Sequence, residues 1–390
     1  MSETFNYSDI TVGVLGSTGS VGVQALDVVR AHNIRLDFLS ANKDVAKIES
    51  QIREFHPRCV AMADKNAARD LAQRIADTEV KIYSGMEGII DMIHESSATC
   101  VVNAILGVAG LKPTVAILES GKRCALSNKE SLVCAGDYVM SLAKARKAEI
   151  IPVDSEHSAI FQALGSTDRK LIKKLLLTAS GGPFFGYTKD RLANVTKADA
   201  LAHPTWKMGA KITVDSASLM NKGFEVIEAV HLFGIAPNNV EVVVHRESII
   251  HSMVEYIDNT VIAELSAPDM SLCVQYAITH PQRSISVTPE LDFCKLSSLS
   301  FAKPDMQTFP LLALAYRAAE SNSSAPCAMN AANEIAVAAF LAEEISFGKM
   351  MECVIDTTER FVSSPLLCDI DALFEIDAEA RRLATAYINK

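Results

Sequence analysis

The first thirty residues combine a short strand, a glycine turn and a helix, and this combination constrains the fold most. Ile10–Leu15 is a β-branched run that leads into Gly16-Ser-Thr-Gly-Ser-Val-Gly22, and a helical pattern follows with Val23, Leu26 and Val29. Such glycines let the main chain turn tightly and approach a pyrophosphate, while the helix N-terminus offers free N–H donors. The spacing is G-x-x-G-x-x-G rather than G-x-G-x-x-G, but its place at the start of the chain supports a dinucleotide site.

The loop after the second expected strand favours NADP over NAD. Leu36–Ser40 is expected to be that strand, and Ala41-Asn-Lys-Asp44 follows it. An NAD site usually has an acidic residue at this strand end, which binds the ribose 2′-hydroxyl. Here the strand end is neutral and Lys43 follows, which suits a 2′-phosphate. The alternative is that Lys43 is a solvated loop charge.

Short strands and helices then alternate up to residue 150. Strands are expected at Cys59–Met62, Lys81–Tyr83, Thr99–Asn103 and 124–126, and a helix at 111–120. This alternation predicts a parallel, doubly wound α/β sheet, a Rossmann-like domain with ligands at the carboxyl ends of its strands. Asn128, Lys129 and Glu130 follow such a strand end, where a polar helix cap is an equally good interpretation.

Ile150–Gln162 places two carboxylates at the end of an apolar run, because Asp154 and Glu156 follow Val153 and precede a helical pattern. In extended main chain, residues i and i+2 point to the same side, so we expect both carboxylates to project together from a strand end. Paired carboxylates repel unless a proton or cation lies between them, and oxygen ligands suit Mg²⁺ or Mn²⁺. The alternative is that either residue merely caps the helix.

Composition narrows the class of protein. A chain of 390 residues, 49% hydrophobic and 22% charged, indicates a globular protein of two or three domains. No apolar run reaches the ~18 residues of a membrane span, and a net charge of -10 without a basic stripe argues against nucleic acid. Nine scattered cysteines without a C-x-x-C pair, and an N-terminus unlike a secretory signal, predict free thiols and a cytoplasmic location.

Two motifs in the middle of the chain suggest a ligand site. Ser180 precedes two glycines, and converging N–H groups and a hydroxyl suit an oxyanion or phosphate, although Ser-Gly-Gly is also a common turn. His203-Pro-Thr-Trp-Lys-Met-Gly209 contains the only Trp of the chain, Trp206. A large aromatic residue there fits a lid that closes and excludes water, or else an ordinary core residue.

A helix is expected to begin near Asp215 and to carry Asn221, Lys222 and Glu225. Positions 221 and 225 share a helix face, and positions 222 and 225 are i, i+3 neighbours. Gly223 costs a helix interior ~1 kcal/mol relative to Ala, which the close approach of a ligand would explain. These side chains can hold a cation and an anion side by side, but an exposed salt-bridged helix is the simpler interpretation.

The remainder of the chain predicts further domains. Strands are expected at 240–244, 248–257 and 260–266, the last two forming a hairpin, and helical periodicity returns between 311 and 388. We therefore expect an NADP-binding domain over residues 1–150 and a central α+β catalytic domain over 151–281, with a flap at about 199–210. A linker over 282–305 and an α-helical domain over 306–390, whose role is support, complete the prediction.

Taken together, these motifs resemble the 1-deoxy-D-xylulose 5-phosphate reductoisomerase family over nearly the whole chain. The stretches that carry the resemblance are Gly16–Gly22, Asn128–Glu130, Val153–Gln162, Ser180–Phe184, His203–Gly209, Val214–Ser218, Met220–Gly223 with Glu225, and Asn330–Ala336. The 153–162 and 214–225 stretches are highly specific in combination, whereas the glycine turn is not.

The resemblance implies an NADPH-dependent enzyme of the non-mevalonate isoprenoid pathway that uses Mg²⁺ or Mn²⁺, with Co²⁺ as a further option. It implies that 1-deoxy-D-xylulose 5-phosphate is rearranged by retro-aldol cleavage and re-ligation and then reduced to 2-C-methyl-D-erythritol 4-phosphate. It also implies a homodimer in which the sheet of the middle domain contributes to the interface. The alternatives are a plain NADP-dependent dehydrogenase and a non-catalytic NADP-binding sensor.

Matching the family's motifs residue by residue implies a role for each site residue. The implied metal ligands are Asp154, Glu156 and Glu225, and Lys129 and His203 join them as catalytic residues. The implied substrate residues are Lys129, Ser155, Glu156, Ser180, His203, Trp206, Ser216, Asn221, Lys222 and Glu225, of which Ser180, Ser216, Asn221 and Lys222 are placed for the phosphate. The implied NADPH residues are Thr18, Gly19, Ser20, Val21, Asn42, Lys43, Asp44, Asn128, Glu130 and Gly209.

Two stretches depart from the family pattern. Ala41-Asn-Lys-Asp44 stands where Gly-Lys-Asn is usual, so the match at this loop depends on Lys43. After Pro268-Asp-Met270 the family usually has Arg and then Pro-Ile, whereas this chain has Ser271-Leu-Cys-Val274. Because that stretch lies outside the metal site, we expect altered packing or interface contacts there rather than lost activity.

Overall fold

The computed structural model describes residues 7–206, 208–296, 298–366 and 369–390. Contacts divide the chain into two compact units. The first unit comprises residues up to 128 together with 141–158 and 269–289, and the second comprises 129–140, 159–268 and 290–390. The expected domain boundaries at 150, 281 and 305 stay a prediction. None of the helices in the described ranges has both the length and the apolar composition that crossing a membrane requires.

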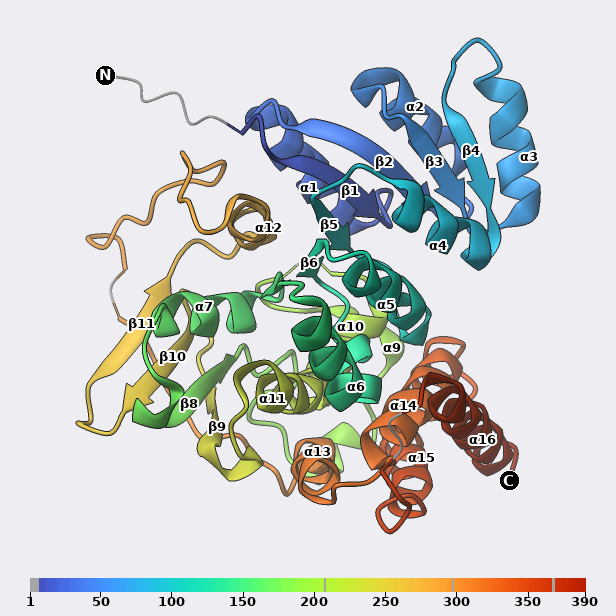
Figure 1. The fold of residues 1–390 in the computed structure, drawn as a ribbon. Helices are drawn as coiled ribbons and strands as arrows, with labels where there is room; N and C mark the ends of the chain where they lie inside the picture. Colours follow the sequence, from blue (N-terminus) through green and yellow to red (C-terminus); the bar gives the residue numbers. More distant parts are fainter. Residues whose placement is uncertain (1–6, 207, 297, 367–368) are drawn as a thin grey trace. The chain divides into compact units, whose positions relative to one another are not determined.

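A seven-stranded parallel sheet in the order β4-β3-β2-β1-β5-β6-β7 forms the centre of the first unit (Figure 1). Its strands are β1 (Thr11–Leu15), β2 (Arg35–Ala41), β3 (Cys59–Met62), β4 (Lys81–Ser84), β5 (Cys100–Asn103), β6 (Arg123–Leu126) and β7 (Ile150–Pro152). β1, β3 and β5 are buried along their whole length, as strands covered on both faces must be. The strand order reverses between β1 and β5, so the predicted doubly wound α/β domain is confirmed.

Three helices of the first unit, α2 (Val45–Phe55), α3 (Lys65–Arg74) and α12 (Met270–Thr279), begin at an aspartate that caps them. The other helices are α1 (Ser20–Ala31), α4 (Gly85–Glu95) and α5 (Leu111–Glu119), with a 3-10 turn η1 (Val108–Gly110). Asp44 and Asp64 accept main-chain N–H bonds at the starts of α2 and α3. α12 packs against α1, and it buries Ser271, Cys273 and Val274 of the stretch that departs from the family pattern. α6 (Glu130–Arg146) and α7 (Ser155–Leu164) have residues in both units.

The second unit contains a mixed four-stranded sheet in the order β11-β10-β8-β9. β10 is antiparallel to both of its neighbours and β8 is parallel to β9, so the predicted β10–β11 hairpin is confirmed. The strands are β8 (Ile172–Ala179), β9 (Val240–Val244), β10 (Ile250–Tyr256) and β11 (Val261–Leu265).

Helices make up the rest of the second unit. They are α8 (Lys189–Leu192), α9 (Lys197–Leu201), α10 (Ala210–Ala217), α11 (Met220–Phe233), α13 (Pro310–Glu320), α14 (Ala325–Leu341), α15 (Phe347–Glu359) and α16 (Ile370–Ile388), with 3-10 turns η2 (Arg169–Leu171) and η3 (Pro237–Asn239). α14, α15 and α16 pack on one another, α13 packs on α11, and α14 also contacts α10 (Figure 1). The C-terminal helices therefore support the two helices that carry the predicted substrate residues.

The helix expected to begin near Asp215 is in fact two helices. α10 ends at Ala217, and Leu219 has a φ of 59°, a left-handed conformation that ends one helix and precedes the next. Asp215 therefore belongs to α10, and that part of the prediction is wrong. The close approach that explains Gly223 comes from α13 rather than from a ligand, because a Cβ there would lie 2.7 Å from Ala315 Cβ.

Candidate functional site

Asp154 and Glu156 lie at the start of α7 rather than along an extended strand. The main-chain oxygen of Asp154 accepts the N–H of Ser158 at 2.8 Å, and Asp154 Oδ1 accepts the N–H of Glu156 at 3.3 Å. The predicted alternation along a strand is therefore wrong, because the helix begins at Ser155. The two residues still offer carboxylate oxygens within 4.8 Å of each other, so they remain a candidate ligand pair and Asp154 caps the helix as well.

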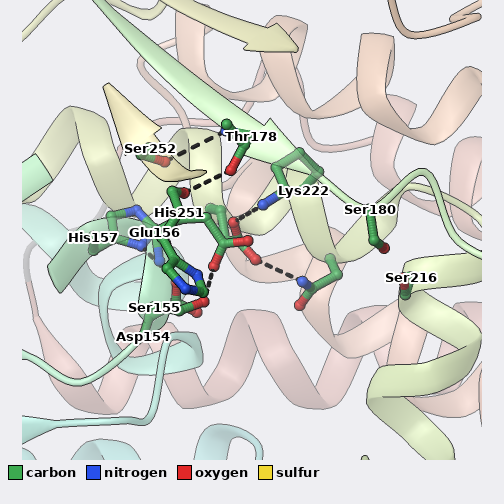
Figure 2. A network of polar contacts seen from close by, with 12 residues as sticks. Asp154, Ser155, Glu156, His157, Thr178, Ser180, Ser216, Lys222, His251 and Ser252 are labelled. Atoms are coloured by element: carbon green, nitrogen blue, oxygen red, sulfur yellow. Dashed lines mark hydrogen bonds and ion pairs between the residues drawn. The ribbon is translucent and has the colours of Figure 1, made fainter. Parts of the chain in front are cut away.

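Neighbouring side chains orient these two carboxylates. His157 Nδ1 lies 3.0 Å from Asp154 Oδ1 and is fully buried, and Ser155 Oγ donates to Glu156 Oε2 (Figure 2). Hydrogen bonds of this kind fix the direction in which a ligand carboxylate presents its free lone pairs. The sequence gives no separate signal for His157 beyond its place in the Val153–Gln162 stretch.

In the second unit, α11 brings Asn221, Lys222 and Glu225 onto one face, as predicted. Asn221 Nδ2 donates to Glu225 Oε1 at 2.5 Å, and Lys222 Nζ forms an ion pair with Glu225 Oε2 (Figure 2). Lys129 Nζ lies 3.1 Å from Glu225 Oε1 and 2.9 Å from Asn221 Oδ1. We call these four residues the lysine–glutamate cluster.

The three charged residues of the lysine–glutamate cluster are buried. Glu225 is 1% exposed and Lys222 is 4% exposed, so the alternative of an exposed salt-bridged helix is wrong. Two ammonium groups beside one buried carboxylate favour its ionised form. Removing either kind of charge would leave an uncompensated buried partner, which is a costly arrangement.

Ser180, His203 and Ser216 form a second group, which we call the serine–histidine cluster. His203 Nε2 lies 3.0 Å from Ser180 Oγ and 3.2 Å from Ser216 Oγ. His203 Nδ1 accepts the main-chain N–H groups of Thr205 and Trp206, at 3.2 and 2.9 Å. The proton of the neutral ring is therefore assigned to Nε2, which donates to the serine hydroxyls.

The ring of His203 favours its neutral form. Burial, together with the positive charge of Arg246, lowers the pKa of His203 below its usual 6.5. The cluster therefore presents one N–H donor and two hydroxyl groups, none of which carries a charge at neutral pH.

The loop after Ser180 consists of two glycines in the left-handed region. Gly181 has a φ of 77° and Gly182 a φ of 64°, and a Cβ on Gly182 would lie 2.6 Å from the main-chain oxygen of Ser216. Only glycine fits these conformations and this close approach. Arg246 Nη1 donates to the carbonyl oxygens of Gly182 at 2.9 Å and of Ser180 at 3.4 Å. Sequence reasoning missed Arg246, whose only signal is its position just beyond an expected strand.

Trp206 lies in the irregular segment between α9 and α10. The residue is half-buried, and its ring centroid lies 6.2 Å from that of His251. Lys207, within the predicted flap, lies outside the described residues. The closing movement of this segment stays a prediction.

A buried polar link joins α10, which carries Ser216, to α14. Lys211 Nζ lies 2.9 Å from Asp215 Oδ2 and 3.3 Å from Glu130 Oε1, and Asn333 Nδ2 donates to Asp215 Oδ1 at 2.7 Å. Sequence reasoning did not assign these contacts to Asp215. They show how a C-terminal helix supports the element on which Ser216 lies.

The glycine turn of the first unit has the geometry of a phosphate-binding turn. Gly16 has a φ of 74°, and a Cβ on Gly22 would lie 2.2 Å from the main-chain oxygen of Gly16. Gly19 is the N-cap of α1, and because glycine has no side chain it cannot bond to the first N–H groups of the helix. The N–H groups at the start of α1 are therefore available to an anion.

The other predicted cofactor residues differ in what they contact. Lys43 is exposed, with its Nζ 3.9 Å from Asp64 Oδ2, and Asp44 caps α2. Asn128 Nδ2 donates to the carbonyl oxygens of Ile105 and Gly107, at 2.7 and 2.9 Å, so it holds that loop. Glu130 begins α6, and Gly209 is the N-cap of α10.

A doubly wound sheet with an open glycine turn after β1 defines a nucleotide-binding α/β protein of the Rossmann type. Family models narrow this class further. Models described as 1-deoxy-D-xylulose 5-phosphate reductoisomerase, its C-terminal domain, and a DXP reductoisomerase C-terminal domain match residues 12–136, 150–233 and 265–383. The chain belongs to the 1-deoxy-D-xylulose 5-phosphate reductoisomerase family.

Individual relatives agree over nearly the whole chain. The 1-deoxy-D-xylulose 5-phosphate reductoisomerase of Bacteroides thetaiotaomicron is 46% identical over 381 residues, which cover 97% of each chain. That of Acetivibrio thermocellus is 48% identical over 372 residues, which cover 95% of this chain and 97% of the relative.

Solved structures agree as well. The Zymomonas mobilis enzyme in complex with NADPH has a TM-score of 0.91 at 38% identity, covering 97% of this chain and 99% of that chain. A DOX-P reductoisomerase in complex with NADPH, fosmidomycin and magnesium has a TM-score of 0.93 at 39% identity, covering 97% and 98%.

Proposed function

We propose that this chain catalyses the NADPH- and metal-dependent rearrangement and reduction of 1-deoxy-D-xylulose 5-phosphate to 2-C-methyl-D-erythritol 4-phosphate in the non-mevalonate isoprenoid pathway. The observation that carries the proposal is the lysine–glutamate cluster, formed by three residues of α11 and Lys129, in a chain that belongs to this family. Its charges suit a ligand that combines a metal ion with a sugar phosphate.

We assign Asp154, Glu156 and Glu225 as the metal ligands. Carboxylate oxygens are the donors that Mg²⁺ and Mn²⁺ prefer, and Co²⁺ is compatible with them. Asp154 and Glu156 already lie close enough to share an ion, and the ammonium groups of Lys129 and Lys222 favour the ionised form of Glu225 that a metal ligand requires. When bound, the ion supplies Lewis-acid polarisation of the substrate carbonyl.

In this proposal one set of side chains binds the phosphate of the substrate and another set faces its sugar part. Ser180, Ser216, Asn221 and Lys222 bind the phosphate, and the Nε2–H of His203, whose direction is fixed, donates to the two serine hydroxyls so that their O–H protons face the substrate. Lys129, Ser155 and Glu156 face the sugar part, and Trp206 closes over it. A phosphate held away from the reacting carbons supplies binding energy that positions them.

NADPH is proposed to bind at the glycine turn of the first unit. The residues assigned to it are Thr18, Gly19, Ser20, Val21, Asn42, Lys43, Asp44, Asn128, Glu130 and Gly209. The free N–H groups at the start of α1 support the pyrophosphate position, and the exposed ammonium group of Lys43 supports a 2′-phosphate.

The chain is further proposed to be a cytoplasmic homodimer. Val261 and Ile262 lie on the edge strand β11 and are 44% and 43% exposed, which supports a second copy on this sheet. The eight cysteines in the described part of the chain are all free thiols, which supports a reducing compartment. Light scattering should give twice the chain mass of 42.1 kDa, and a single-chain mass would contradict the dimer.

A coupled assay tests the proposed function. NADPH oxidation should require both 1-deoxy-D-xylulose 5-phosphate and a divalent ion, stop on addition of EDTA, and resume when excess Mn²⁺ is added. Turnover that a chelator does not diminish would contradict the metal role and favour a plain dehydrogenase. NADPH binding without any turnover would favour a sensor.

A further inference from the structure

We propose that Arg246 is a positioning residue for the phosphate end of the substrate, because it holds the Ser180–Gly182 loop and places a positive charge beside the serine–histidine cluster. The inference rests on the proposed function, which assigns the phosphate to Ser180 and Ser216. Arg246 belongs to neither the lysine–glutamate cluster nor the serine–histidine cluster.

Arg246 holds the Ser180–Gly182 loop through two main-chain carbonyl groups. One guanidinium nitrogen donates to the carbonyl oxygens of Ser180 and Gly182, at 3.4 and 2.9 Å. These charge-assisted bonds span a loop whose two glycines have positive φ angles of 77° and 64°. The N–H of Gly182 donates to Ser180 Oγ at 3.3 Å, so with both carbonyl oxygens engaged by Arg246 the loop can present the O–H proton of Ser180 to an anion.

Arg246 is itself anchored from two sides. Its Cζ lies 5.1 Å from the ring centroid of Phe185, in the same segment as Ser180. Its main-chain oxygen lies 3.5 Å from Thr205 Oγ1, two residues after His203. A planar guanidinium that stacks on a ring and bonds to carbonyl groups is held more rigidly than a lysine would be. Arg246 therefore connects the segment of Ser180 with the segment of His203.

The charge of Arg246 acts on the serine–histidine cluster. Its positive charge contributes, after burial, to lowering the pKa of His203, so its field extends to that ring. The same field stabilises an anion at this place. Because the cluster contains two hydroxyls and a neutral imidazole, Arg246 supplies the positive charge that these three groups lack.

The experiment compares Arg246→Gln, Arg246→Lys and a control, Arg191→Met. Arg191 is an exposed residue of the same unit whose guanidinium lies 3.5 Å from the ring centroid of Tyr187 and donates to Tyr187 Oη at 2.9 Å. Neither residue makes one of the Arg246 contacts described above, so this replacement removes one charge and leaves those contacts in place. The readouts are kcat and KM for 1-deoxy-D-xylulose 5-phosphate, KM for NADPH, and the inhibition constant of inorganic phosphate.

Arg246→Gln should raise KM for the substrate and the phosphate inhibition constant together by about tenfold, with a smaller effect on kcat and none on KM for NADPH. Arg246→Lys keeps the charge but loses the planar fork, so it should give values between Arg246→Gln and wild type. Arg191→Met should match wild type. A merely structural role would not couple the substrate KM to phosphate inhibition.

The proposal is overturned if Arg246→Gln matches Arg191→Met, or if only kcat falls while phosphate inhibition is unchanged. If Arg246→Gln does not fold, Arg246→Lys decides: a phosphate inhibition constant raised about threefold supports the proposal, and the wild-type value overturns it. Failure of the proposed function would look different, because wild type itself would not oxidise NADPH. Calorimetry of inorganic phosphate binding would then still test Arg246.

Discussion

His203 shows how the fold prepares a single side chain for an anion. Two main-chain N–H groups occupy Nδ1, so the remaining proton must lie on Nε2, which points at two serine hydroxyls. Protonation of Nδ1 would break both main-chain bonds in addition to placing a charge in a partly buried site. Because the neutral ring donates to both serine hydroxyls, it leaves their own O–H protons available to a phosphate over the whole neutral pH range.

The lowered pKa of His203 predicts a pH dependence of stability. Between the lowered value and the usual 6.5, the unfolded chain binds more protons at this residue than the folded chain does. Unfolding is therefore favoured as the pH falls through this window. The Tm of wild type should fall more from about pH 7 to about pH 5 than the Tm of His203→Gln, measured by circular dichroism. Equal pH dependence in the two proteins would contradict the assigned neutral ring.

At the scale of elements, the turn after β8 depends on glycine for two separate reasons. Gly182 needs a positive φ, as many turns do, and its Cα also approaches the main chain of α10 closely. Gly186 lies in the same segment with a φ of 79°, yet in the described chain nothing lies within 4 Å of where its Cβ would be. Comparing Gly182 with Gly186 therefore distinguishes the cost of a positive φ from the cost of a steric overlap.

Gly182→Ala should therefore be much worse than Gly186→Ala. Both substitutions cost about 1–2 kcal/mol for an L-residue in the left-handed region. Gly182→Ala adds an overlap with the oxygen of Ser216, worth about 1–3 kcal/mol, and it displaces a predicted phosphate residue. Urea unfolding measures the free energies and steady-state kinetics measures KM for the substrate. Equal losses in both variants would show that the approach to α10 is unimportant.

Local patterns predict some elements better than others. The alternation of apolar runs and helical segments marks the seven parallel strands, and the glycine spacing marks the turn after β1, because these are properties of neighbouring residues. The break at Leu219 was missed, since a leucine in a left-handed conformation is held by packing that the local sequence does not show. The sequence predicts extended main chain at Asp154 and Glu156 for a similar reason, because one residue decides whether β7 continues or α7 begins.

At the scale of the whole molecule, the contacts that were missed join residues far apart in the chain. Arg246 bonds to Gly182 over 64 positions, and Asn333 bonds to Asp215 over 118. The local sequence around one residue of each pair does not indicate its distant bonding partner. The family motifs nevertheless identified Asn221, Lys222 and Glu225, whose helical spacing alone shows that they share a face.

The assignment of one ion to Asp154, Glu156 and Glu225 is the claim on which the proposed function depends most. It unites carboxylates that lie some seventy positions apart in the sequence, and it explains why a chain with a nucleotide-binding sheet retains a buried acidic residue on α11.

The most direct measurement is an anomalous difference map from crystals of the protein grown with Mn²⁺. We predict one strong peak within bonding distance, about 2 Å, of a carboxylate oxygen from each of the three residues. A peak that Glu225 does not contact, or no peak in a protein that still turns over the substrate, would contradict the account.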